Sequence, residues 1–192
     1  RADQLVAASL SPNTLIDQTK RAANVDFSGI TVDENNIIVG PAVAAALRDV
    51  RLLGALLVAA EATGSAAACL DTTVDYLKTR KQFGAVIGSF QALGHRAAEL
   101  FAAMELARSC GEAALQEIDA QSNSVAKACS LSKAKVGDFL HTMSNQLIQI
   151  HGGIGMTDEF DAGLYLKRAR VLETLYGNQS YHRDRYARLL GF

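Results

Sequence analysis

Residues 80–90, RKQFGAVIGSF, separate two long stretches of helical sequence. Upstream, Pro41 lies where the first turn of a helix tolerates proline, and an alanine- and leucine-rich run continues to about Thr79. Downstream, the spacing of apolar residues predicts a second helix from about Gln91 to Asp119. Its expected core stripe consists of Leu93, Ala97, Leu100, Met104 and Ala107. Two long helices with so short a connection are predicted to pack as antiparallel neighbours.

The sequence after these two helices continues the same pattern. A third helix is predicted from about Asn123 to Ile150, with apolar residues every three or four positions. This seam consists of Val125, Cys129, Val136, Leu140, Met143, Leu147 and Ile150. The glycine-rich sequence HGGIGMTDEFDAG, residues 151–163, ends the helix, and two shorter helices follow at about 162–175 and 179–190. The predicted fold is mainly α, an antiparallel helix bundle.

The N-terminal segment, residues 1–39, has a different pattern of apolar residues. Apolar residues alternate as in a strand around Ser28 and Gly29, and ENNIIVG ends in a short apolar run, so we expect strands with turns. The alternating residues are Val25, Phe27, Ile30 and Val32. Such a segment is too short for a sheet that is stable alone. We therefore predict that residues 1–39 belong to a larger sheet, completed by a longer polypeptide or another subunit, and that residues 40–192 form the bundle.

The composition narrows the classes of function. With 19 Lys+Arg against 20 Asp+Glu, the chain offers no broad basic surface for nucleic acid. No apolar run reaches the roughly 18 residues of a membrane span, and a signal-peptide pattern is lacking, so we expect a cytoplasmic protein. The cysteines have no close Cys or His partner, which favours buried thiols over a metal site or disulfide. They are Cys69, Cys110 and Cys129.

Two loops concentrate the polar chemistry. Arg80 and Lys81 stand at a helix C-terminus, where they complement the helix dipole, but Gln82, Phe83 and Gly84 follow at once. An arginine fork beside an aromatic ring suits a diphosphate attached to a planar ring system.

The second loop, QIHGGIG at residues 149–155, has a bare backbone that lets a ligand approach main-chain amides. Its glycines are Gly152, Gly153 and Gly155, and His151 between them could hydrogen-bond a ligand. Alone, each loop is also typical of a simple turn between helices.

Together, and in this order, the motifs RKQFG, Phe90-Gln91, QIHGGIGMTDEF and GNQSYHR resemble the C-terminal half of the acyl-CoA dehydrogenase family. The upstream sequence RAANVDFSGITVDENNIIVG resembles the closing strands of that family's middle β-domain, so the resemblance covers residues 19–192. It implies a flavoprotein that binds FAD and desaturates acyl-CoA thioesters at the α,β-carbons. A carboxylate removes the α-proton while the β-hydride passes to the flavin.

The resemblance also implies roles for individual residues. One group would contact the FAD diphosphate and ring edge across a dimer interface: Arg80, Gln82 and Phe83, with Gln91 nearby. A second group would contact the adenine and diphosphate side of an FAD: Gln149, Gly152 and Gly153. Asn178 and Gln179 would touch the cofactor near the catalytic loop. The resemblance further implies an oligomer, usually a dimer of dimers, and an electron-transferring flavoprotein as electron acceptor.

The departures from the family pattern concern the base. Tyr176 stands where many relatives carry the catalytic Glu, and a tyrosine is a poor base for the weakly acidic α-proton of a thioester. A second branch of the family carries the Glu on the first long helix, at the position that is Gly54 here; the arginine that orders substrate falls at Ala55. Other carboxylates that could act instead are Glu61, two helical turns on, Glu159 and Glu173.

Three hypotheses follow. In one, the chain is a catalytic acyl-CoA dehydrogenase whose base is Tyr176 or an unaligned residue. In another, it is a flavin-binding, non-catalytic subunit of a hetero-oligomer, as in actinobacterial enzymes that shorten steroid side-chain CoA thioesters. The third is a structural oligomerisation subunit without flavin. The loss of both bases beside intact flavin loops favours the second hypothesis.

Overall fold

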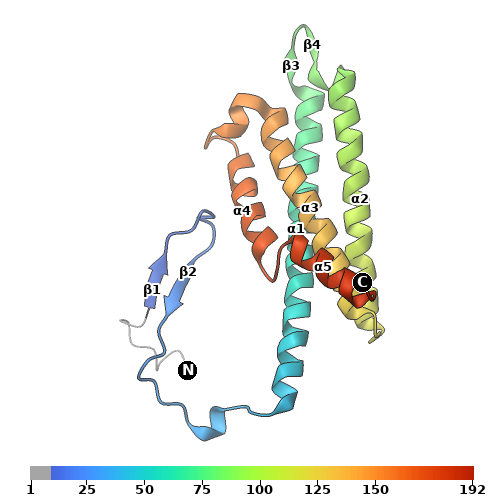
Figure 1. Ribbon diagram of the computed structural model, residues 1–192. Helices are drawn as coiled ribbons and strands as arrows, with labels where there is room; N and C mark the ends of the chain where they lie inside the picture. The colour runs from blue at the N-terminus through green and yellow to red at the C-terminus, as the bar shows by residue number, and fades with distance from the viewer. Residues whose placement is uncertain (1–9) are drawn as a thin grey trace. The chain divides into compact units, whose positions relative to one another are not determined.

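The computed structural model describes residues 10–192, and the chain divides into two compact units, residues 1–49 and 50–192. In the first unit, β1 (Leu10–Asn13) and β2 (Ala22–Val25) form an antiparallel pair in which Leu10 lies opposite Val25 (Figure 1). The short β segment before the bundle is therefore confirmed. The predicted domain boundary at residues 39/40 stays a prediction, and residues 1–9 lie outside the described part.

The placement of the strands was wrong. The alternation expected to form a strand beyond Val25 crosses a turn, because the Asp26 carboxylate accepts a hydrogen bond from the Ser28 amide and Gly29 has a φ of 77°. Farther on, Asp33 caps a short 3-10 helix, η3 (Glu34–Asn36), where strand sequence was expected. Local side-chain to backbone hydrogen bonds therefore override the period-two pattern of this segment.

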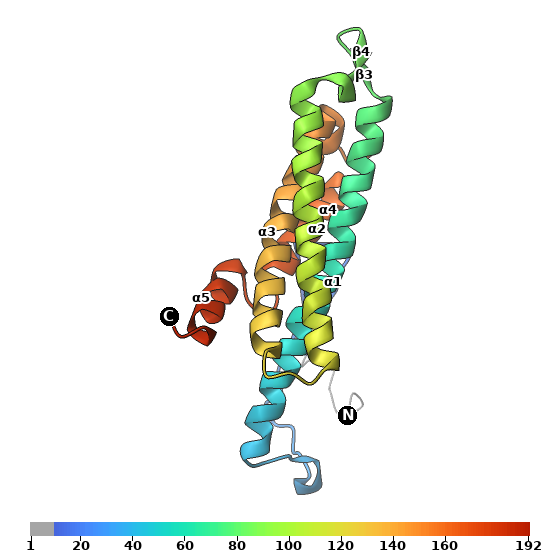
Figure 2. The same cartoon turned by 90° about the vertical axis from the view of Figure 1, so that its right-hand side faces the viewer.

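The second unit is a bundle of antiparallel helices, as predicted (Figures 1 and 2). Its third helix, α3 (Val125–His151), contacts the second, fourth and fifth helices. The helices are α1 (Pro41–Thr79), which begins in the first unit, α2 (Gln91–Asp119), α3 (Val125–His151), α4 (Ala162–Thr174) and α5 (Gln179–Leu189).

The core lies along the predicted stripes of α2 and α3. Leu100, Met104 and Ala107 of α2 are buried against α3 residues such as Val136 and Met143. The rest of the α3 seam is buried as well, except for Val125, which is partly buried. This packing fixes the loops at both ends of the bundle.

Neither a membrane span nor a metal site is evident in residues 10–192. No helix in this range is both long and apolar enough to cross a bilayer, and it holds no cluster of three potential metal ligands. Cys69 and Cys129 are buried free thiols, as expected, and Cys110 is half-buried. Burial raises the pKa of the Cys69 thiol to about 12.

Candidate functional site

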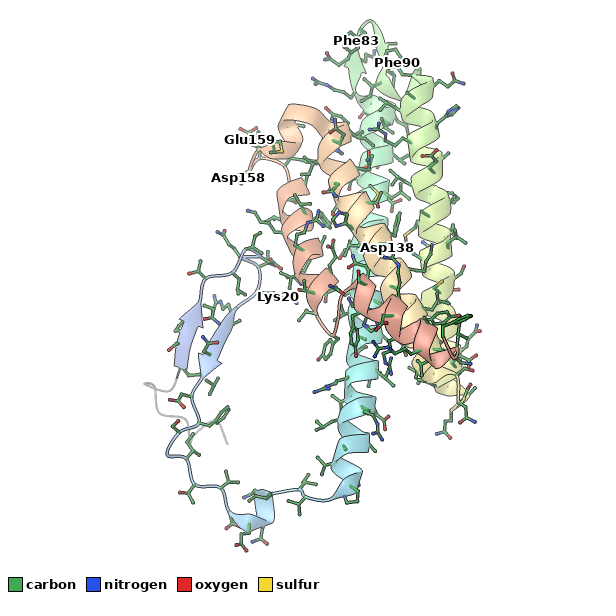
Figure 3. All side chains as sticks on the ribbon, viewed as in Figure 1. Lys20, Phe83, Phe90, Asp138, Asp158 and Glu159 are labelled. Carbon is green, nitrogen blue, oxygen red and sulfur yellow. The ribbon has the colours of Figure 1, made fainter. Side chains whose placement is uncertain are left out.

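The first candidate region is a small hairpin at the end of the bundle where α1 passes into α2. Strand β3 (Lys81–Gln82) pairs with β4 (Ala85–Val86) across the two-residue turn Phe83-Gly84. Both turn residues have positive φ, 52° and 78°, as a type I′ hairpin requires. Phe83 at its tip is 92% exposed and lies beside Phe90, with ring centroids 6.3 Å apart (Figure 3).

The conformation of Phe83 is itself informative. A non-glycine residue at positive φ is uncommon, and a bulky ring there costs roughly 1–3 kcal/mol. No core packing compensates this strain, because the ring projects into solvent. Strain that persists at an exposed aromatic side chain points to a ligand or partner that the ring contacts.

Arg80 is fixed through its backbone while its side chain stays open. Its amide donates to Tyr76 O and its carbonyl accepts from Ile87 N, each at 2.9 Å. Among residues 10–192, no ion pair or side-chain hydrogen bond involves its exposed guanidinium. Gln82 and Gln91 are also exposed. The hairpin thus presents a cation, two amides and a ring to the outside.

The glycine loop follows α3 as a 3-10 helix, η5 (Gly152–Met156). Gly152 ends α3 with a φ of 63°, and nothing lies within 4 Å of where a side chain would begin on Gly152 or Gly153. Gly155, by contrast, packs against the end of α3, where an added Cβ would be 2.9 Å from Ile148 O. Gln149 is exposed on the last turn of α3. Two bare glycines and an amide therefore face open space, and their contact with a cofactor stays a prediction.

His151 does not share that exposure. Its ring lies between Tyr76 and Phe160, with centroids 4.2 and 4.5 Å away, and its Nδ1 contacts Leu147 O at 2.7 Å. The residue is 3% exposed, and burial lowers the pKa of its imidazole. The expectation that His151 could hydrogen-bond a ligand is not supported; it closes the core beneath the loop.

The second candidate region is the loop between α4 and α5. Tyr176 and Gly177 both have positive φ, 56° and 106°. The Tyr176 ring lies directly on Gly54 of α1, so close that a Cβ on Gly54 would be 2.5 Å from Tyr176 Cζ. The two positions where the resemblance expects alternative bases therefore meet in space, and a phenol ring covers the glycine.

Side chains from α5 hold this loop. His182 Nε2 contacts Tyr176 O at 3.0 Å, and Asn178 caps α5 by accepting from the Tyr181 amide at 2.9 Å. Gln179 lies over Gly137, where an added Cβ would be 3.0 Å from its Cγ. Asn178 thus has a structural partner already, whereas Gln179 lies flat along α3.

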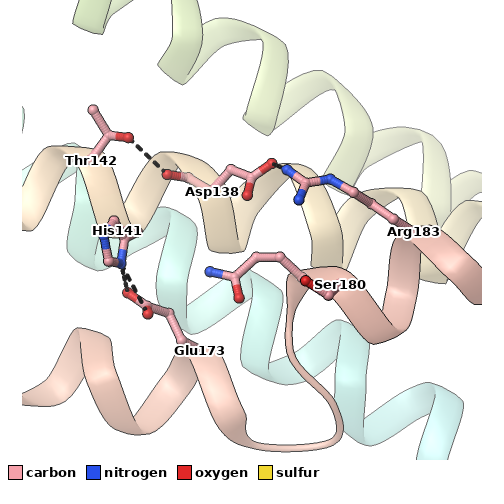
Figure 4. A pocket seen from close by; sticks show the side chains of 7 residues that line it. Asp138, His141, Thr142, Glu173, Ser180 and Arg183 are labelled. Carbon is pink, nitrogen blue, oxygen red and sulfur yellow. Dashed lines mark hydrogen bonds and ion pairs between the residues drawn. The ribbon is translucent and has the colours of Figure 1, made fainter.

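Gln179 borders a shallow pocket of about 480 Å³ between α3, α4 and α5 (Figure 4). The charged groups there are mutually paired. Glu173 contacts Arg170 and also His141, whose Nδ1 is 3.1 Å from Glu173 Oε2, and Arg183 pairs with Asp138. No carboxylate in this pocket is left without a partner.

The other carboxylates suggested by the sequence are no better placed as bases. Glu61 binds Arg168 at 2.6 Å on the outside of the bundle. Glu159 is exposed in the segment after the glycine loop (Figure 3).

Comparison with known proteins is decisive for the family. The family described as acyl-CoA dehydrogenase, C-terminal domain, matches residues 45–191. The chain belongs to the acyl-CoA dehydrogenase family. It is 42% identical over 123 residues to the acyl-CoA dehydrogenase IpdE2 of Mycolicibacterium smegmatis. The aligned region covers 64% of this chain and 38% of IpdE2.

Two further relatives are informative. The CarC subunit of the caffeyl-CoA reductase-Etf complex of Acetobacterium woodii is 31% identical over 128 residues, covering 67% of this chain and 33% of CarC. The solved structure of a Tcur3481-Tcur3483 steroid ACAD variant superposes with a TM-score of 0.81 at 25% identity, over 95% of this chain and 48% of that chain. The chain thus spans half or less of the length of these relatives.

Within this acyl-CoA dehydrogenase domain, the predicted site residues form two separate groups. The hairpin and glycine-loop residues lie at one end of the bundle, and Tyr176, Asn178 and Gln179 lie on its flank. At 1.5 Å per residue, Gly137 under Gln179 is about 18 Å from Gln149 along α3, and Gly54 is about 38 Å from Thr79 along α1. Within one chain, the hairpin and Tyr176 are therefore far apart.

Proposed function

We propose that this chain is a flavin-binding, non-catalytic subunit of an FAD-dependent acyl-CoA dehydrogenase. It completes an FAD site shared with a partner subunit, and the partner provides the carboxylate that removes the α-proton. The observation that carries the proposal is the Tyr176 ring on Gly54. Both candidate base positions lack a carboxylate, and the ring fills the space that a side chain on Gly54 would need.

The hairpin and glycine loop fit the cofactor end of this role. The open Arg80 guanidinium can bind a diphosphate in a bidentate manner, and the exposed Phe83 ring offers a flat surface for a ring edge. Gly152 and Gly153 leave room for the adenine side. FAD would supply the hydride acceptor; the residues of this chain would bind and orient it.

The separation of the two groups of residues supports a shared cofactor. A distance of about 38 Å along α1 exceeds the reach of one dinucleotide, so the hairpin and the Tyr176 loop would serve different flavins in an oligomer. The name of CarC places that relative in a complex with Etf, and the Tcur3481-Tcur3483 enzyme is called a steroid ACAD. By analogy, a hetero-oligomer, a bulky acyl-CoA thioester and an electron-transferring flavoprotein are the proposed partners.

A flavin absorption spectrum tests this function. Straight-chain and steroid acyl-CoAs are added anaerobically to the chain, alone and with any co-purifying partner. Reduction of bound flavin is followed as the bleaching of its absorption. We expect bleaching only when the partner is present, and no change in that bleaching with Tyr176→Phe. Bleaching by the chain alone that disappears in Tyr176→Phe would instead establish Tyr176 as the base.

The flavin contact has its own variant in the same assay. Arg80→Ala removes charge-assisted hydrogen bonds, so FAD affinity of the assembly should fall about 10- to 100-fold. Lys78→Ala removes a neighbouring exposed cation on α1 and serves as the matched control, with unchanged affinity. Equal FAD affinities for wild type and Arg80→Ala would contradict the proposed contact between the hairpin and FAD, which we call the clamp. A chain that never retains flavin would favour the hypothesis of a structural oligomerisation subunit.

A further inference from the structure

Lys133 is a buried cation whose contacts are all backbone carbonyls. The residue is 2% exposed and lies in the first half of α3. Its Nζ donates to Leu172 O at 3.0 Å, Glu173 O at 3.2 Å and Gly177 O at 3.0 Å. An ammonium group has three N–H donors, so the charged form satisfies all three acceptors.

The positions of these carbonyls give the contact its meaning. Leu172 and Glu173 lie in the last turn of α4, whose carbonyls have no helical N–H partner and carry the negative end of the helix dipole. Gly177 lies beyond Tyr176 in the loop. Lys133 therefore ties the chain on both sides of Tyr176 to α3.

A simple packing role does not account for this arrangement. Lys133 occupies the seam between Cys129 and Val136, where a leucine-like residue would fill the core without the cost of burying a charge. The Glu173 carboxylate does not compensate the charge by direct contact, because it pairs with Arg170 and His141. The charged group instead holds the backbone at the end of α4 and in the loop that follows it.

We infer that Lys133 is a positioning residue that sets the Leu175–Asn178 loop, and thereby holds the Tyr176 ring on Gly54 and orients Gln179. The loop anchor stands on the geometry alone; its consequence for a flavin rests on the proposed function. His182 assists from α5 by contacting Tyr176 O. The Leu175–Asn178 loop is thus held from both α3 and α5.

A titration of the wild-type chain tests the anchor without any mutation. Burial lowers the pKa of Lys133 to about 8, and the Glu173 carboxylate from α4 opposes that shift; His182 and Arg185 of α5 are ionisable groups nearby. Deprotonation leaves two N–H groups for three carbonyls. In carbonyl-labelled protein, the Leu172, Glu173 and Gly177 resonances should shift together with a midpoint near pH 8.

The control resonance is the Ala126 carbonyl. This carbonyl accepts a hydrogen bond from the Arg185 guanidinium at 3.3 Å. Because the guanidinium stays charged over the whole pH range, the Ala126 carbonyl resonance should not shift. Carbonyl resonances of the loop that titrate separately, with different midpoints, would overturn the inference, because one ammonium group would then not hold all three carbonyls. Resonances that stay constant between pH 6.5 and 9.5 would mean that Lys133 keeps its charge over this range, and the hydrogen exchange below would then decide.

Hydrogen exchange of the full chain then separates positioning from general stability. In Lys133→Met we expect the Leu175 and Gly177 amides to exchange about tenfold faster, with the interior of α3 unchanged. Lys135→Met, an exposed lysine on the same helix, should leave both regions unchanged. Uniform acceleration over the whole bundle would overturn the positioning role, and if Lys133→Met does not fold, the wild-type titration decides.

The flavin consequence has a separate readout. The FAD affinity of the assembly should fall about tenfold in Lys133→Met and stay constant in Lys135→Met. A wild-type assembly without FAD affinity would contradict the proposed function while leaving the carbonyl titration as it stands. Unchanged FAD affinity together with faster exchange of the loop amides would mean that Lys133 positions the Tyr176 ring but does not affect FAD binding through Gln179.

Discussion

The hairpin and the α4–α5 loop contain the same local feature in opposite surroundings. Each has an aromatic residue followed by glycine, Phe83-Gly84 and Tyr176-Gly177, with both residues at positive φ. Phe83 projects into solvent, and a Cβ added to Gly84 would meet nothing within 4 Å. Tyr176 lies on Gly54, and an added Cβ on Gly177 would be 2.5 Å from Tyr181 Cδ1.

The difference between these regions shows that the same backbone conformation can have two different roles. At the hairpin, the strained conformation is held by a short ladder of backbone hydrogen bonds and presents a ring outward. In the loop, Lys133 and His182 hold the backbone, and the ring closes on its own chain. The first arrangement leaves a ring free to contact another molecule, and in the second the ring packs against its own chain.

A pair of glycine substitutions gives the largest expected effect. Gly84→Ala and Gly177→Ala both place a Cβ at positive φ, which costs about 1 kcal/mol. Only Gly177→Ala also drives that Cβ into Tyr181 and His182, so its free energy of unfolding should fall by about 2–4 kcal/mol. Urea unfolding of both variants measures the difference, and equal losses would show that the loop adapts as freely as the hairpin.

Acid should weaken the loop before it affects the hairpin. Burial lowers the pKa of His182, and the nearby Lys133 and Arg185 lower it further against the contact with Tyr176 O. Because the folded pKa lies below the unfolded value near 6.5, the stability from neutral His182 is complete above pH 6.5 and is lost as the pH falls. The slope is at most about 1.4 kcal/mol per pH unit.

His151 titrates in the same direction, since burial also lowers its pKa, so the two histidines must be separated. Urea unfolding between pH 7.5 and 5 measures the slope for wild type and for His182→Gln, which removes one titrating group. We expect a shallower slope in His182→Gln. An identical slope would assign the acid sensitivity to His151 and the glycine loop.

The bundle could be predicted from the sequence because its helices are long and periodic. The bounds of α1 and α2 agree with Pro41, Thr79, Gln91 and Asp119, which the apolar spacing and the break at residues 80–90 indicated. The N-terminal strands were misplaced because the Asp26 turn has the same apolar alternation as a strand. Short apolar runs carry too little information to separate the two.

The site was predictable only where a motif is contiguous. The hairpin conformation itself was missed, because type I′ turns favour Asn-Gly over Phe-Gly. The contact of Tyr176 with Gly54 joins residues far apart in the chain, and no local pattern reports it. Lys133 did leave a signal, the gap in the α3 seam between Cys129 and Val136, where a charged residue takes the place of an apolar one.

The smallest expected effect separates the function of the hairpin from its stability. Phe83→Asn creates the Asn-Gly pair that a type I′ turn prefers, so the free energy of unfolding should rise by about 0.5–1 kcal/mol. The matched variant Tyr176→Asn relieves similar strain but removes the ring from Gly54, so it should bring no net gain.

The same Phe83→Asn protein should bind FAD less tightly in the assembly, because the exposed ring is absent. Urea unfolding and flavin titration on one preparation measure both quantities. A more stable chain with weaker FAD binding is what a strained residue kept for a ligand should give. A more stable chain with unchanged FAD binding would mean that Phe83 contacts a partner protein rather than the cofactor, which would leave Arg80 as the main contact of the clamp.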